Sequence, residues 1–137
     1  MKVALVSCAK KKRFGCHAAK DLYTSALFKL TFQYASKNYD RVFILSAHYG
    51  LLDPNESVQT YDKTLRDMSG AQRRKWASDV LLQICLYIPR EAEIHYFCGE
   101  LYRKYLIGRL GRVEAVPLQG MRIGKQLQWY KNNLDRE

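Results

Sequence analysis

Three polar side chains follow an apolar run in the first half of the chain and are candidates for chemistry. Residues 42–45 are apolar, Ser46 and His48 come next, and Asp53 stands directly before a proline. An apolar run that stops at turn residues is typical of a buried strand. In open parallel α/β sheets, ligands bind just beyond the carboxyl ends of the strands. The pattern therefore predicts a ligand site that includes Ser46, His48 and Asp53.

Each of these residues has a chemical and a structural interpretation. His48 suits general acid or base catalysis, because an imidazole titrates near neutral pH; the alternative is a hydrogen bond to its turn. Asp53 suits the orientation of His48 or the stabilisation of positive charge; the alternative is a role in the Asp-Pro turn. Asp62 lies in a long polar connection, residues 53–68, and such connections often cover a site.

A second strand end lies near the N-terminus and is strongly basic. Residues 3–6 are apolar, and Ser7, Cys8, Lys10 and Lys12 follow them. Hydroxyl, thiol and ammonium groups at a strand end suit an anion such as phosphate, although the glycine spacing of a P-loop is missing. The alternative is a loop of solvated lysines. Cys8 is also a candidate nucleophile, because neighbouring cations favour a thiolate; otherwise it is a packing residue.

A third strand end carries Gly99 and Glu100, with a predicted helix directly after it. The glycine allows a ligand to approach the backbone, and the carboxylate suits sugar hydroxyls; helix capping is the alternative role of Glu100. Tyr23, Tyr49 and Tyr61 lie on or near these loops. Aromatic faces beside cations suit base stacking, although tyrosines also lie commonly at the edge of a core.

The charge of the chain indicates a polyanionic partner. Its 137 residues carry a formal net charge of +10, from 23 Lys and Arg against 13 Asp and Glu. The cations cluster in residues 10–13, 73–75 and 103–112. A basic domain of this size attracts nucleic acid or nucleotide phosphates, and solubility alone is the alternative explanation.

Composition narrows the class of protein further. A content of 47% hydrophobic and 26% charged residues is typical of a globular chain, and the length fits one domain over residues 1–137. No apolar stretch is long enough for a membrane span and no signal peptide is expected, so we expect a cytoplasmic protein. The three histidines lack paired spacing and the four cysteines are scattered. We therefore expect neither a metal site nor a cofactor.

Hydrophobic periodicity predicts alternating strands and helices. This alternation indicates a three-layer α/β/α domain with a mostly parallel sheet of about four strands. Thr24 or Ser25 caps the first predicted helix, and Ser69 caps the second. The predicted strands cover residues 3–6, 41–46, 93–98 and 112–116. The predicted helices cover residues 24–38, 70–87, 100–107 and 123–134.

Six blocks of the sequence resemble a family of small, largely uncharacterised bacterial and phage proteins. The opening Ser-Cys-x-Lys-x-Lys (residues 7–12) and the Tyr-x-Ser block (residues 23–25) are similar to the archaeosine synthase catalytic domain and, remotely, to the YaaA peroxide-stress proteins. Related folds include DNA glycosylases that excise modified pyrimidines such as 5-hydroxymethyluracil. The blocks cover residues 6–12, 21–25, 43–47, 50–54, 61–65 and 117–124.

The resemblance implies binding to, or action on, nucleic-acid bases. It adds Ser25 and Gln119 to the expected substrate-binding residues. Archaeosine synthase-like sequences carry further domains that hold tRNA, and this chain shows none, so DNA is expected before RNA. The resemblance also implies a place in DNA repair or DNA modification.

These observations lead to one leading hypothesis, hydrolysis of the N-glycosidic bond of a modified base in DNA. Ser7 and Ser46 would bind the base edge, and Tyr23 and Tyr49 would stack on an extruded base. Asp53 or Asp62 would stabilise the positively charged sugar or position water, with His48 transferring a proton. Two alternatives stay open: a non-catalytic DNA- or RNA-binding stress protein, and a hydrolase or transferase of small nucleotides.

Overall fold

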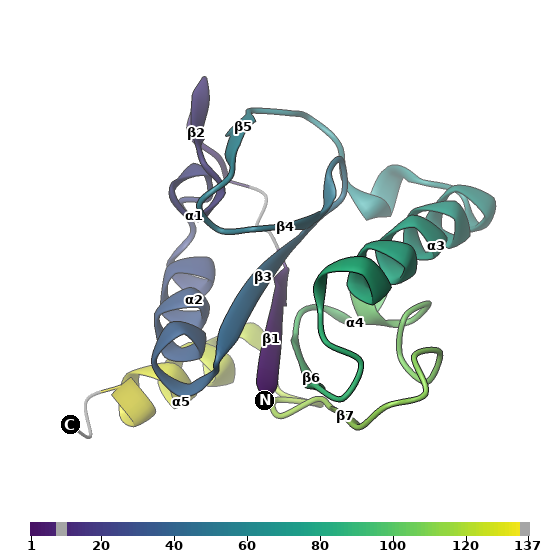
Figure 1. The fold of residues 1–137 in the computed structure, drawn as a ribbon. Coiled ribbons are helices and arrows are strands. Elements are labelled where there is room, and N and C mark those ends of the chain that lie inside the picture. The colour runs from purple at the N-terminus through teal and green to yellow at the C-terminus, as the bar shows by residue number, and fades with distance from the viewer. Residues whose placement is uncertain (8–10, 135–137) are drawn as a thin grey trace.

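A five-stranded sheet forms the centre of the computed structural model, which describes residues 1–7 and 11–134 (Figure 1). The strand order is β4-β3-β1-β6-β7. The first strand pairs in parallel with β3 on one side and β6 on the other, β7 is parallel to β6, and β4 alone is antiparallel to its neighbour β3. The strands are β1 (Lys2–Ser7), β3 (Arg41–Ser46), β4 (Gly50–Leu52), β6 (Glu93–Phe97) and β7 (Glu114–Ala115).

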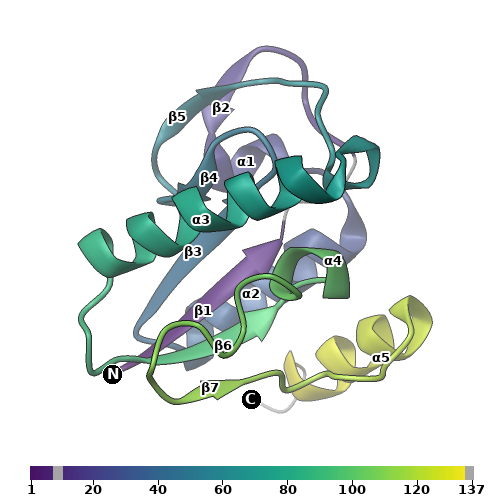
Figure 2. The ribbon, with the colours of Figure 1, turned by 90° about the vertical axis from the view of Figure 1, so that its right-hand side faces the viewer.

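Helices cover both faces of this sheet (Figure 2). One face carries α2 (Ala26–Asn38) and α5 (Ile123–Leu134), and the other carries α3 (Gly70–Tyr87) and the short α4 (Glu100–Arg103). In β1, Val3 and Leu5 pack with the α3 side, whereas Ala4 and Val6 pack with the α2 side. A strand that is apolar on both faces is typical of a parallel sheet between helices. The predicted α/β class with three layers is therefore confirmed.

Capping residues fix where the two long helices begin. The Oγ of Ser25 accepts a hydrogen bond from the amide of Phe28 at 3.2 Å and starts α2. Ser69 and Gln72 form a capping box at the start of α3. It gives hydrogen-bond acceptors to two backbone amides that have none within the helix. The predicted ranges 41–46, 70–87 and 123–134 agree with the observed elements.

The structure differs from the sequence prediction in the shorter elements. Residues 50–52, expected as a turn, form the antiparallel edge strand β4, so the sheet has five strands rather than four. The helix expected over residues 100–107 ends at Arg103, and the strand expected over 112–116 is reduced to Glu114–Ala115. Gly108 and Gly111 adopt positive φ angles of 81° and 65°, a conformation that interrupts regular structure after α4.

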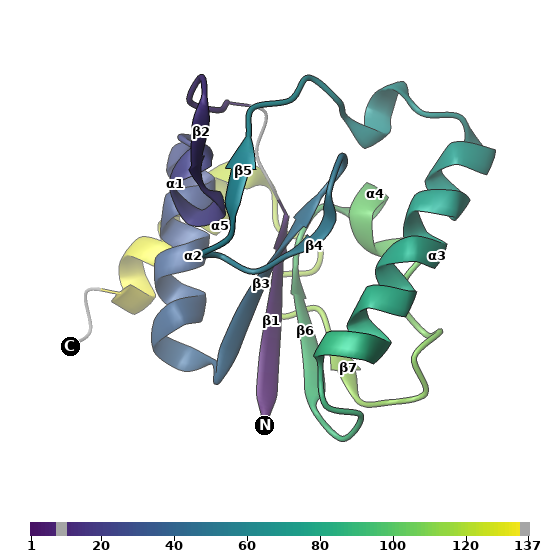
Figure 3. The ribbon, with the colours of Figure 1, turned by 45° about the horizontal axis from the view of Figure 1, so that its top comes forward.

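A second, two-stranded sheet lies beyond the carboxyl ends of β1 and β3 (Figures 1 and 3). It pairs β2 (Cys16–Ala18) with β5 (Ser57–Gln59), and α1 (Ala19–Leu22) follows β2. The long connection 53–68 therefore contains a strand, and the 3-10 turn η1 (Leu65–Asp67) comes near its end. In the part of the chain that the structure describes, no helix is long and apolar enough to cross a membrane.

Candidate functional site

Two predicted site residues end neighbouring strands at the same edge of the sheet. Ser7 is the last residue of β1 and Ser46 is the last residue of β3. The two strands are parallel, and Ser7 pairs with Leu45, the residue directly before Ser46. This carboxyl edge is the place where parallel sheets commonly bind ligands. Cys8 and Lys10, which were also expected there, lie outside the described residues.

Ser46 is the centre of a hydrogen-bond network at this edge. Its side chain is fully buried, donates to the hydroxyl of Tyr61 at 2.9 Å, and accepts from the amides of His48 at 3.2 Å and Tyr49 at 3.0 Å. Its carbonyl accepts from the indole of Trp76 at 2.9 Å. The single hydroxyl proton of Ser46 is therefore used inside the protein. The expectation that Ser46 binds a base edge directly is wrong; this residue orders the turn after β3.

Tyr61 joins this network to three further rings, those of Tyr23, His48 and Tyr49. We call these four ring residues, together with Ser46, the strand-end cluster. The hydroxyls of Tyr61 and Tyr23 lie 2.9 Å apart. The ring of His48 stacks on that of Tyr61 with centroids 5.4 Å apart and an interplanar angle of 24°. The ring of Tyr49 stands edge-on to Tyr61 at 5.6 Å. The sequence does not predict this central position of Tyr61, although residues 61–65 form one of the blocks that resemble the small bacterial and phage family.

Two tyrosines that were expected to stack on a base make contacts within the protein. Tyr23 is only 1% exposed, so the expectation that its ring stacks on an extruded base is wrong. Tyr49 is half-buried, and its hydroxyl donates to the carbonyl of Gln59 at 3.0 Å, which braces β5. Ser25 caps α2, as described above. These residues hold the edge of the sheet in shape.

One cation contacts the strand-end cluster, and two more are its neighbours in the sequence. The ammonium group of Lys12 lies 4.5 Å from the ring centroid of Tyr61, a cation–π contact. The side chains of Lys11 and Arg13 are exposed, and Nε of Arg13 donates to the carbonyl of Asp21 at 3.1 Å. Arg73, in a second basic run, donates instead to the carbonyl of Leu65 at 2.8 Å and holds η1 against α3. Lys11 and Arg13 are therefore exposed cations in the segment that carries Lys12, and the second basic run also has an exposed cation, Arg74.

The predicted carboxylates lie in different places. Strand β4 runs back along β3, so Asp53 lies beside the first half of β3 and not at the carboxyl edge. Its Oδ2 is 3.8 Å from the guanidinium of Arg41, and its Oδ1 accepts from the amide of Asn55 at 2.9 Å. The expectation that Asp53 lies beside His48 is therefore wrong, and its observed role is that of a turn residue. Asp62 is exposed and follows Tyr61 directly.

Glu100 lines a cavity of about 330 Å³ at the carboxyl end of β6. Glu100 is exposed, and an added Cβ on Gly99 or Gly120, which also line the cavity, would meet no described atom within 4 Å. Gln119 is exposed in the same loop as Gly120, and its amide donates to the carbonyl of Val116. The lining of the cavity includes Phe97, Glu100, Arg103, Leu118, Gln126 and Tyr130.

A half-buried thiol, that of Cys98, contributes to the wall of this cavity. Burial raises the pKa of Cys98 to about 12, so the thiol stays protonated at neutral pH. The guanidinium of Arg103 donates to the carbonyl of Cys98 at 2.9 Å and fixes the turn into α4. Cys98 is therefore a wall residue and not a thiolate nucleophile.

The carboxyl ends of parallel strands meet at one edge of a sheet, which predicts a common cleft for five residues that follow strand ends: Ser7, Cys8, Ser46, His48 and Glu100. The structure separates two of them. His48 lines a different cavity of about 410 Å³, together with Lys63, Lys75, Trp76 and Asp79. Glu100 lines the cavity beside β6, so the prediction of one cleft shared by His48 and Glu100 is wrong. Different helices line the two cavities, since α3 lines one and α4 and α5 line the other. No group of three or more metal-ligating side chains occurs among residues 1–7 and 11–134.

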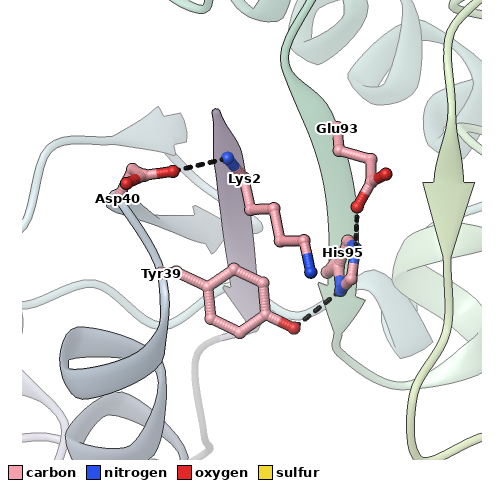
Figure 4. Close-up of polar contacts among 5 residues, drawn as sticks. All are labelled: Lys2, Tyr39, Asp40, Glu93 and His95. Atoms are coloured by element: carbon pink, nitrogen blue, oxygen red, sulfur yellow. Dashed lines mark hydrogen bonds and ion pairs between the residues drawn. The ribbon is translucent and has the colours of Figure 1, made fainter.

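A further polar cluster lies on β6, away from the carboxyl edge (Figure 4). Nε2 of His95 is 2.8 Å from a carboxylate oxygen of Glu93, and Nδ1 of His95 is 2.6 Å from the hydroxyl of Tyr39. The hydrogen bond from His95 lowers the pKa of Glu93, and burial raises the pKa of Tyr39 to about 12. The side chain of Lys2 extends toward this group. The cluster joins α2 to the sheet.

The sequence matches the model of a known protein family. The match covers residues 3–132, which is nearly the whole chain. The chain belongs to the DUF6884 family. DUF6884 is described as a family of unknown function, so membership shows homology and not an activity. No curated protein matches this DUF6884 chain significantly.

Proposed function

We propose that this protein binds DNA across the carboxyl edge of its sheet and hydrolyses the N-glycosidic bond of a modified base. The observation that carries the proposal is the cavity of about 330 Å³ beside β6, which has a carboxylate, Glu100, in its lining. Of the three carboxylates considered from the sequence, Glu100 is the one that lines a cavity at this edge, whereas Asp53 contacts Arg41.

The lining of the cavity suits a nucleobase. Phe97 and Leu118 supply apolar surface to the wall, which favours burial of a flat ring. Tyr130 also lines the cavity but is only 1% exposed, so it offers no open face for stacking. Glu100 and Gln126 supply oxygen and amide groups that suit the polar edge of a base or the hydroxyl of a modified one. Gly99 and Gly120 leave the backbone open to close approach.

The proposed reaction consumes one water molecule. The bond between C1′ of the sugar and the base nitrogen breaks, and the base leaves with the bonding electrons and takes up a proton. The oxygen of water bonds to C1′ and the water loses a proton. Positive charge grows on the sugar in the transition state, so a fixed carboxylate at Glu100 stabilises it more than the ground state. His48 lines the other cavity, so the proton transfers of this reaction are not assigned to it.

The charge distribution supports a polymer substrate. A net charge of +10 with exposed cations at Lys11 and Arg13 favours a phosphate backbone over a neutral ligand. We therefore expect affinity for DNA to fall steeply as salt rises. Replacing both of these residues by Ala is expected to reduce the salt slope by about two, because each neutralised phosphate contributes a slope of roughly one.

A second candidate function is DNA or RNA binding without catalysis. The observation that favours it is the saturation of the strand-end cluster, in which Ser46 bonds to Tyr61, His48 and Tyr49. A network of this kind serves a rigid binding surface as well as it serves a catalytic one. The two functions differ in whether a base is released.

Mass spectrometry of released bases tests the proposal. The protein is incubated with single- and double-stranded DNA and RNA oligonucleotides that carry modified pyrimidines, 5-hydroxymethyluracil among them. Release of a base from at least one DNA oligonucleotide is the expected result. Binding without release across the panel would overturn the enzyme proposal in favour of the binding protein, and equal turnover of the free nucleoside would favour a small-nucleotide hydrolase.

A further inference from the structure

Phe14 has the most exposed large apolar side chain in the described part of the chain. Its relative exposure is 95%, against 69% for Leu86 and 63% for Val113, the next in order. An isolated exposed apolar residue needs no explanation by itself. Phe14 differs because of the residues that hold it and the residues that flank it.

The backbone around Phe14 is fixed by hydrogen bonds on both sides. The amide of Arg13 donates to the carbonyl of Leu22 at 2.7 Å, and the amide of Thr60 donates to the carbonyl of Gly15 at 3.0 Å. Gly15 adopts a φ of 99°, which only glycine reaches without strain. Nε2 of His17 lies 2.9 Å from the carbonyl of Phe14 itself. The fold therefore holds the loop in place while the ring projects into solvent.

Cations precede the ring in the same loop. Lys11, Lys12 and Arg13 come directly before Phe14, and the ends of Lys11 and Arg13 are exposed. An aromatic ring beside cations matches single-stranded nucleic acid, in which phosphates and unpaired base faces alternate. A membrane surface would need a broader apolar face than one ring, so it fits the loop less well.

The loop is tied directly to the strand-end cluster. Thr60, which bonds to Gly15, immediately precedes Tyr61, and the ammonium group of Lys12 lies over the ring of Tyr61 at 4.5 Å. A nucleic acid on the loop would therefore lie next to the carboxyl edge of the sheet. This position suits a residue that separates or supports bases beside the site.

We infer that Phe14 stacks on an unpaired base of a bound nucleic acid while the adjoining cations hold its phosphates. This inference rests on the nucleic-acid partner of the proposed function, but not on base hydrolysis. The stacking residue lies outside both cavities, so it governs affinity for unpaired bases and not the choice of base.

Titration of a fluorescein-labelled single-stranded oligonucleotide tests the inference. The variant Phe14→Ala is expected to bind about tenfold more weakly, with an unchanged salt slope because no charge is lost. Phe14→Trp is expected to keep the affinity, and its exposed indole is expected to lose fluorescence on binding. Leu82→Ala, at a residue that is 62% exposed on α3, is the matched control and is expected to bind like the wild type.

The outcomes separate the two proposals. Equal affinity of Phe14→Ala and the wild type would overturn the stacking role while leaving the proposed function intact. Failure of the wild type to bind any oligonucleotide would overturn both. Release of a base without an effect of Phe14→Ala would support the enzyme alone, and weakened binding without base release would support the stacking residue alone.

Discussion

The hydroxyl oxygen of Tyr39 lies 2.6 Å from Nδ1 of His95, and this contact ties the end of α2 to strand β6. With Nε2–H of His95 donating to Glu93, Nδ1 is the acceptor and the phenol is the donor. The two rings also meet edge-on, with centroids 5.1 Å apart. One tyrosine thus connects two layers of the fold by polar and aromatic contacts.

Removal of this hydroxyl is expected to destabilise the fold. In Tyr39→Phe the ring still packs on Phe97, but Nδ1 of His95 loses its donor in a half-buried place. We expect the free energy of unfolding to fall by about 1–2 kcal/mol, measured by urea denaturation. Tyr87→Phe, at a residue that is 61% exposed, is the control and should change little. Equal stability of Tyr39→Phe and the wild type would show that the hydrogen bond contributes nothing.

Alkaline pH is expected to weaken the fold through its buried tyrosines. Burial raises the pKa of Tyr39 and of Tyr130 to about 12, from an ordinary value of 10.0. Between these two pKa values the folded protein keeps phenol protons that the unfolded chain has lost. The free energy of unfolding is therefore unaffected below the ordinary pKa and declines as the pH rises toward 12. Urea midpoints should fall over this range. Midpoints that stay constant there would contradict the burial of these phenols.

Ser46 is expected to matter for the shape of the site more than for contact with a ligand. Ser46→Ala leaves the amides of His48 and Tyr49 without their acceptor and removes the hydroxyl that donates to Tyr61. We expect a loss of about 1–3 kcal/mol in unfolding free energy, measured by thermal or urea denaturation. The matched control is Ser78→Ala, at an exposed position on α3. If Ser46→Ala is as stable as this control, the buried network does not order the turn.

The sequence predicts the long elements because their signals are local. The capping box of Ser69 and Gln72 marks the start of α3 within four residues, and the apolar run before Ser46 marks β3. The edge strand β4 escapes the same reasoning because three residues, Gly50–Leu52, are too few to show periodicity. Its pairing with β3 depends on tertiary contacts that no local pattern contains.

The same limit applies to the candidate site. The grouping of Ser7 with Ser46 follows from parallel strands, which alternation with helices predicts. The position of Asp53 depends on the direction of β4, and an unrecognised antiparallel strand carries it away from His48. Tyr61 bonds to Ser46 across a separation of 15 residues that contains the short strands β4 and β5, so its central role needed the folded structure.

A kinetic comparison of Glu100→Gln with the wild type tests the central claim most directly. Base release from a modified oligonucleotide is measured under single turnover, with oligonucleotide affinity and urea midpoint measured in parallel, and Asp53→Asn serves as the matched carboxylate control. We predict that Glu100→Gln slows release by about a hundredfold with affinity and stability little changed, while Asp53→Asn keeps a rate near the wild type. Full activity of Glu100→Gln would contradict the account, because the carboxylate of the cavity would then have no part in the reaction.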